Sequence, residues 1–178
     1  MKKHGMLCRI LCLFVFIVLL AACNRKVTYT ENPEWSNLSD RQQAMLTYLE
    51  TTGMQVIKQG MRFTFVIPTD CFFVKTTREL KAHRVKDLMV LAQFIRSYTN
   101  YFVSSRIKIT GYTDEVWLAP ARDKLSLRYA KTIASNLEEN GVHSRMIDVR
   151  GSGANHPIAS NEYPMGTAFN KRVEITIH

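Results

Sequence analysis

The amino-acid sequence predicts a domain of the α/β (α+β) class, in which a sheet is covered on one face by two helices. Segments that alternate apolar and polar residues, as half-buried strands do, are separated by two longer segments whose apolar residues recur at helical spacing. The order is strand, helix, strand, helix, strand, loop, strand. Because helices that connect strands pack on the face of their sheet, this order predicts two layers.

The N-terminus has the parts of a bacterial export signal, which we assign to residues 1–22. Its positive charges are Lys2, Lys3 and Arg9. The apolar segment that follows is shorter than the ~20 residues needed to span a bilayer. Leu-Ala-Ala-Cys at 20–23 resembles the lipobox of bacterial lipoproteins, so Cys23 is expected to carry a lipid; the alternative is an uncleaved anchor. Asn24, rather than Asp, favours the outer membrane, with the domain facing the periplasm.

Two segments precede the domain. Residues 23–37 show no periodicity and contain Pro33, which predicts a flexible, lipidated tether. Residues 38–60 predict a helix, capped by Ser39 or Asp40 and ended by Gly53, followed by a short strand.

The domain itself is expected at residues 61–178, with no second domain and no repeat. Its expected elements are strand 61–67, a turn at 69–70, an extended segment 71–74, a helix from 77 to about 98, strand 106–111, a helix opened by Pro120 and closed by Asn140-Gly141, strand 146–150, a loop from 151 to about 168, and strand 172–177.

Charge and cysteine content limit the possible partners. The formal net charge of the 178 residues is +9, and loss of the three basic residues of the signal leaves +6. This charge either favours anionic partners, such as cell-wall polymers or lipid headgroups, or only solvates the protein.

Cys71 is the one thiol left after processing and lipidation, which excludes an intramolecular disulfide. Its neighbours Phe72 and Phe73 predict that it is buried.

The sequence offers no pattern for catalysis or for nucleic-acid binding. The histidines are scattered, so no metal site is expected, and no nucleophile, zincin or P-loop motif occurs. No basic helix or aromatic platform suggests nucleic acid. We therefore expect a non-enzymatic protein with no cofactor other than the covalent lipid on Cys23.

Four motifs in matching order resemble the OmpA-like peptidoglycan-binding domain. They are Gly-Tyr-Thr-Asp at 111–114, Leu-Ser-Leu-Arg-Tyr-Ala at 125–130, a Gly-rich loop at 151–157, and Asn-Lys-Arg-Val-Glu at 170–174. The resemblance implies a β-α-β-α-β-β domain with a mixed sheet. It also implies binding to the diaminopimelate residue of the peptidoglycan stem peptide.

The resemblance implies site residues as well. In this family an Asp binds the ammonium of diaminopimelate and a helix Arg binds its carboxylate, a task that suits the planar guanidinium fork. Asp114 matches the Asp of the family. Thr113, Asn170 and Arg172 also lie in the matching motifs and are further candidate binding residues. Alternatives remain for three of them: Asp114 caps its loop as an Asx turn, Asn170 only orders the loop end, and Arg172 is a solvated strand residue.

The chain departs from the family pattern at the carboxylate ligand. The family Arg position falls on Tyr129, so Arg122 or Arg128 is the candidate substitute. Trp117 replaces a customary Gly and, with Leu118, forms either a protein-contact patch or a loop folded back on the core.

A narrower resemblance lies upstream, at residues 49–60 and 65–73. These segments are similar to the DotK/IcmN family of small lipoproteins in Dot/Icm type IVB secretion systems. The resemblance implies a structural part in an outer-membrane core complex, with other secretion-system proteins as partners and peptidoglycan as a further one. The alternative is a general lipoprotein that tethers the outer membrane to the cell wall and has no role in secretion.

Overall fold

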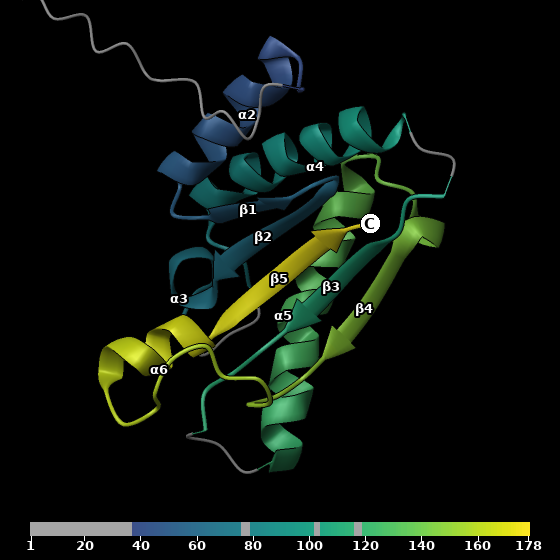
Figure 1. Ribbon diagram of the computed structural model, residues 1–178. Helices are drawn as coiled ribbons and strands as arrows, with labels where there is room; N and C mark the ends of the chain where they lie inside the picture. The colour runs from purple at the N-terminus through teal and green to yellow at the C-terminus, as the bar shows by residue number, and fades with distance from the viewer. Residues whose placement is uncertain (1–36, 76–78, 102–103, 116–118) are drawn as a thin grey trace, which may run out of the picture. The chain divides into compact units, whose positions relative to one another are not determined.

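The computed structural model describes residues 37–75, 79–101, 104–115 and 119–178 (Figure 1). The expected signal at 1–22, the lipid site at Cys23, the tether except for its last residue, and the pair Trp117 and Leu118 lie outside these ranges. No helix in the described part of the chain combines the length and the apolar character needed to cross a membrane.

Five strands form one mixed sheet in the order β1-β2-β5-β3-β4 (Figure 1). They are β1 (Gln55–Gln59), β2 (Arg62–Pro68), β3 (Ile107–Gly111), β4 (Ile147–Gly151) and β5 (Arg172–Ile177). Only β3 and β4 pair in parallel, while the other three pairs are antiparallel. The predicted fold is therefore confirmed, with the last strand inserted between the first and second strands of the β-α-β-α-β-β core.

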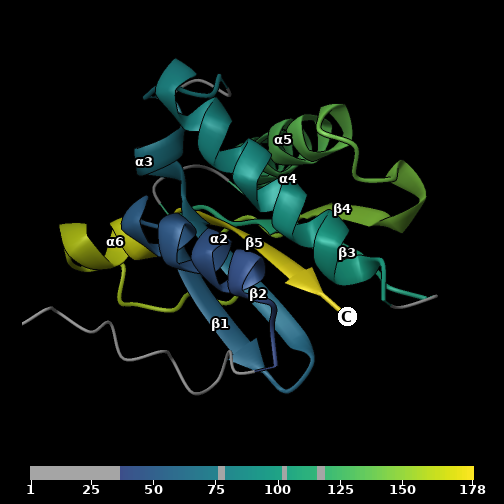
Figure 2. The same ribbon diagram turned by 90° about the horizontal axis from the view of Figure 1, so that it is seen from above.

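The two long helices, α4 (Val85–Thr99) and α5 (Ala119–Glu139), cover the same face of this sheet (Figure 2). The alternation of β2 turns Phe63 and Phe65 toward the helices, where both are fully buried. The Phe63 ring lies 5.2 Å from that of Phe94 and 5.0 Å from that of Tyr98, both in edge-to-face contact. These aromatic contacts attach α4 to the sheet.

The first described helix, α2 (Asp40–Thr51), packs beside α4. Ser39 caps it as predicted, because its hydroxyl accepts a hydrogen bond from the Gln42 N–H and the Gln42 side chain accepts one from the Ser39 N–H. The Tyr48 hydroxyl donates to the buried carboxylate of Asp87 in α4 at 2.7 Å. Residues 37–178 thus form one compact unit, which includes the segment 38–60.

One expectation between β2 and α4 is wrong. Residues 69–74 do not form a turn and an extended segment; Thr69–Phe72 form the single helical turn α3. Thr69 and Phe72, three residues apart, share its buried side, while Cys71 lies on the other side and is exposed rather than buried. The apolar neighbours of Cys71 therefore misled the prediction, because in a helical turn adjacent residues do not share a face.

The helix predicted from residue 77 also begins later than expected. Leu80 forms an isolated β-bridge with Phe73, and a 3-10 turn, η2 (Ala82–Arg84), leads into α4. A further short helix, α6 (Pro164–Asn170), lies in the segment predicted as a loop, and Pro164 occupies its first turn.

Candidate ligand-binding site

Backbone hydrogen bonds at the end of β3 position Asp114. The Tyr112 N–H donates to the carbonyl of Arg172 at 2.8 Å, and the Thr113 N–H donates to the carbonyl of Gly153 at 2.8 Å. The backbone before Asp114 is therefore held between β5 and the loop that follows β4. A carboxylate at the end of a sheet strand is where α/β folds commonly place binding residues.

Two glycines let α5 approach this end of the sheet. Gly111 and Gly151 are paired across β3 and β4. A Cβ at Gly111 would overlap the carbonyl oxygen of Ser126 in α5, and one at Gly151 would lie 2.6 Å from the Leu127 nitrogen. The Ser126 hydroxyl in turn accepts a hydrogen bond from the Gly153 N–H at 3.0 Å. Helix, strand ends and loop are thus joined at the end of β3 that leads to Asp114.

A pocket of about 750 Å³ opens at this position, within the size range of small-molecule sites. It is lined by Asp70, Phe73, Lys75, Lys81, Thr113, Asp114, Ala121, Leu125, Tyr129 and Lys171. Asp114 is only 7% exposed and Thr113 only 3%. The structure therefore brings two of the residues singled out from the sequence, Thr113 and Asp114, into one pocket.

Tyr129 fills part of the pocket wall at the position where the family pattern has Arg. Its ring meets that of Phe73 at a centroid distance of 4.6 Å and an interplanar angle of 60°. Burial raises the pKa of the Tyr129 phenol, and the negative charges of Asp70 and Asp114 raise it further. The phenol is therefore neutral at physiological pH and lies within electrostatic reach of both carboxylates.

Three lysines supply positive charge to the pocket: Lys75, Lys81 and Lys171. The Lys171 ammonium pairs with the Asp70 carboxylate at 2.6 Å, and the Lys81 ammonium donates to the Asp70 carbonyl at 2.8 Å. None of these lysines was among the site residues predicted from the sequence. Lys171 lies inside one of the four motifs, next to Arg172, but no pattern indicated that Lys81 would face the same cavity.

The two arginines considered as substitutes for the family Arg lie elsewhere. Arg128 is exposed on α5, and it does not line the pocket. Arg122 is also outside the lining, and its guanidinium donates to the Glu115 carbonyl at 3.5 Å. The turn of the helix explains the position of Arg128, because one residue corresponds to about 100° around the axis.

Asn170 and Arg172 hold the loop between β4 and β5, and neither lines the pocket. The buried Asn170 amide accepts hydrogen bonds from the N–H groups of Ile158 and Ala159, and donates to the Ala159 carbonyl and the Asn161 side chain. This is the loop-ordering geometry that the sequence left open for Asn170.

Arg172 is buried rather than solvated. Its guanidinium pairs with Glu174 at 2.7 Å and donates to the carbonyls of Asn170 and His156. It also lies 4.0 Å from the centroid of the Tyr112 ring, in cation–π contact. The guanidinium thus connects β5 to the loop and to the residue two before Asp114.

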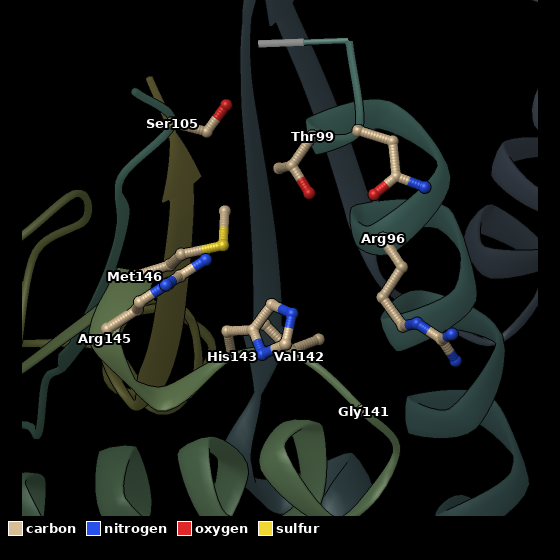
Figure 3. A pocket seen from close by; sticks show the side chains of 9 residues that line it. Arg96, Thr99, Ser105, Gly141, Val142, His143, Arg145 and Met146 are labelled. Carbon is tan, nitrogen blue, oxygen red and sulfur yellow. The ribbon is translucent and has the colours of Figure 1, made fainter. Parts of the chain in front are cut away.

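A second pocket, of about 650 Å³, lies near the opposite end of β3, between the last turn of α4 and the segment that links α5 to β4 (Figure 3). Its basic side chains are Arg96, His143 and Arg145. Arg96 donates to the Asn140 carbonyl at 3.4 Å, just beyond the end of α5. Cations at helix C-termini stabilise the unpaired carbonyls there, which accounts for Arg96 structurally.

The fold is of the mixed α/β type, and carboxylate and ammonium groups face one cavity in it. Within the described ranges, no three His, Cys, Asp or Glu side chains are grouped to hold a metal ion. The chain belongs to the OmpA family, whose family model matches residues 72–171.

Several known proteins resemble the chain. It is 31% identical over 126 residues to the probable lipoprotein YiaD of Escherichia coli, across 71% of this chain and 56% of YiaD. It is 26% identical to the outer-membrane lipoprotein YfiB of Pseudomonas aeruginosa, across 94% of this chain and 90% of YfiB. Over 74 residues it is 40% identical to the peptidoglycan-binding protein ArfA of Mycobacterium tuberculosis, across 42% of this chain and 23% of ArfA. The chain thus spans about half of YiaD and a quarter of ArfA.

Among solved structures, the cell wall anchor of the type VI secretion system of Pseudomonas aeruginosa has the same fold. The TM-score is 0.67 at 24% sequence identity, and the match covers 75% of this chain and 94% of the other.

Proposed function

We propose that this chain is a non-catalytic outer-membrane lipoprotein, anchored by a lipid on Cys23, whose domain faces the periplasm and binds peptidoglycan. The observation that carries the proposal is the pocket at the end of β3, where backbone hydrogen bonds of Tyr112 and Thr113 position the chain directly before Asp114. A carboxylate in such a pocket suits the ammonium of diaminopimelate in the stem peptide.

The names of two relatives support this proposal. ArfA is named as a peptidoglycan-binding protein, and it is 40% identical to this chain over the 74 matched residues. YfiB is described as an outer-membrane lipoprotein and matches nearly the whole chain. The lipobox at 20–23 agrees with that second description.

Within that role, we infer that the protein is a structural component of the outer-membrane core complex of a Dot/Icm type IVB secretion system, as in the DotK/IcmN family. One observation favours a protein partner. Four large apolar side chains are exposed along one short segment of the chain: Ile158, Tyr163, Met165 and Phe169. The hydrogen bonds of Asn170 and Arg172 hold this segment in place, and exposed apolar groups on an ordered segment are typical of interaction sites. A lipoprotein that only tethers membrane to wall is the alternative.

Sedimentation with purified sacculi tests the wall-binding role. The full-length protein in detergent is expected to pellet with sacculi, and Asp114→Ala is expected to lose this binding. Asp148→Ala is the matched control, because Asp148 is an exposed carboxylate on β4 outside the pocket. Failure of the wild-type protein to pellet, or equal pelleting of Asp114→Ala, would refute wall binding through this pocket.

Affinity purification from envelopes tests the secretion role separately. The lipidated protein is expected to recover core-complex components, and Phe169→Ser with Met165→Ser is expected to reduce that recovery without affecting sacculus binding. Recovery of no secretion-system component in the wild type would favour the alternative tether.

A further inference from the structure

The pocket has a positive corner as well as a negative one. Lys171 and Lys81 both contact Asp70. The Lys171 ammonium contacts its carboxylate, and the Lys81 ammonium contacts its backbone carbonyl. The backbone reinforces this arrangement, because the Thr69 N–H donates to the Lys171 carbonyl at 3.0 Å and so joins α3 to the start of β5. Two ammonium groups thus converge beside one carboxylate, which leaves positive charge at this corner.

The Asp70–Lys171 pair is open to exchange. The Asp70 side chain is 56% exposed and that of Lys171 is 30% exposed. Ion pairs in contact with solvent contribute only about 0–1 kcal/mol, since water competes with each partner. A ligand carboxylate that enters the pocket can therefore take the place of Asp70 at little cost.

Tyr129 lines the same pocket as Asp114 and Asp70. The pKa of its phenol is raised by the charges of Asp70 and of Asp114, so both carboxylates act on the same ring. The ring is 8% exposed and packs on Phe73. The part of the wall that α5 contributes at this position is therefore a neutral aromatic ring and not a positive charge.

We propose that Lys81 and Lys171 bind the carboxylate of the zwitterionic amino-acid group whose ammonium Asp114 binds. The assignment rests on the proposed binding of peptidoglycan in this pocket, and it moves the carboxylate site from helix α5 to two lysines that contact Asp70 of α3. Lysine is a point charge without the planar fork of arginine, so this site recognises the negative charge more than the carboxylate geometry.

Titration of the full-length protein with two soluble stem peptides tests this assignment. Both peptides end in diaminopimelate. In the first, the carboxylate of its zwitterionic amino-acid group is free, and in the second this same carboxylate is an amide. The wild-type protein is expected to prefer the acid by about tenfold, the effect of one charge-assisted hydrogen bond. Lys81→Met with Lys171→Met is expected to bind both peptides equally, whereas Asp114→Asn is expected to lose both.

Two further variants complete the test. Lys131→Met removes an exposed lysine of α5 outside the pocket and is expected to keep the wild-type preference. Asp70→Asn removes the competing carboxylate and is expected to bind the acid peptide more tightly. If the double lysine variant keeps the preference for the acid while Asp114→Asn abolishes binding, the lysine assignment is wrong and wall binding stands. If the wild type binds neither peptide, both proposals fail.

Discussion

The ring of Tyr129 on α5 packs edge-to-face against Phe73, which follows α3, with their centroids 4.6 Å apart. This contact forms part of the pocket wall at the position where the family pattern has an arginine. It connects the helix that carries the motif at 125–130 to the segment that carries the lysines. One substitution therefore changes both the packing and the charge distribution of the site.

Loss of the Tyr129 ring is expected to destabilise the domain. Tyr129→Ala should lower the free energy of unfolding by about 3 kcal/mol, because a buried aromatic ring is removed and Phe73 loses its partner. Tyr129→Phe keeps the ring and should change it by less than about 0.5 kcal/mol. Denaturant unfolding followed by circular dichroism measures both, and similar losses in the two variants would contradict a packing role for the ring.

Enlarging either glycine beneath the site is expected to displace α5. Gly111→Ala and Gly151→Ala each place a Cβ against the Ser126–Leu127 turn of the helix, and overpacking of this kind costs about 1–3 kcal/mol. The displacement should also weaken sacculus binding, because Asp114 follows Gly111 by three residues. Unfolding and sedimentation measured on the same variants test this link. Unchanged stability of both variants would show that the helix adjusts without strain.

Removal of the Asn170 amide is expected to release the loop before α6. Asn170→Ala deletes four hydrogen bonds to residues 158–161 and should cost roughly 3 kcal/mol, since the backbone groups left behind are partly buried. Hydrogen exchange should increase locally in that segment. Asn170→Asp retains the acceptor but places a carboxylate oxygen against the Ala159 carbonyl and the Asn161 side-chain oxygen, so it should not restore the wild-type stability. An unchanged hydrogen-exchange rate of this segment in Asn170→Ala would contradict the prediction.

Alkaline pH is expected to destabilise the domain through Tyr129. Burial, followed by Asp70 and Asp114, raises the phenol pKa in the folded protein, while the unfolded chain titrates near about 10. The folded state thus holds this proton more tightly. The associated stability is complete below about pH 10 and is lost as the pH rises through the folded-state pKa.

Unfolding measured at a series of alkaline pH values tests this expectation. The free energy of unfolding should fall less steeply in Tyr129→Phe than in the wild type. A fall remains in the variant, because burial also raises the pKa values of Tyr98 and Tyr112. Equal slopes in the two proteins would exclude Tyr129 as a contributor.

Most of the fold could be predicted because its determinants are local. The alternation of 61–67 is found in β2, the cap at Ser39 begins α2, and the Gly141 that closes α5 has a φ of +87°. The segment 69–74 could not be predicted from alternation, because a single helical turn and a β-bridge leave no period to detect. Its outcome depended on contacts with Leu80 and with the start of β5.

The sequence by itself determined the order of strands and helices, the OmpA-like motifs and the placement of Asp114 at the end of a strand. The resemblance also implied that Tyr129 occupies the family arginine position, and the structure places it in the pocket. Only the tertiary structure decided which positive charges share the cavity. Lys81 and Lys171 are far apart in the chain, and they meet at Asp70 because β2 and β5 are neighbours in the sheet and α3 is hydrogen-bonded to Lys171. Local periodicity carries no information about a contact between residues so far apart in the chain, because that contact depends on the pairing of strands across the sheet.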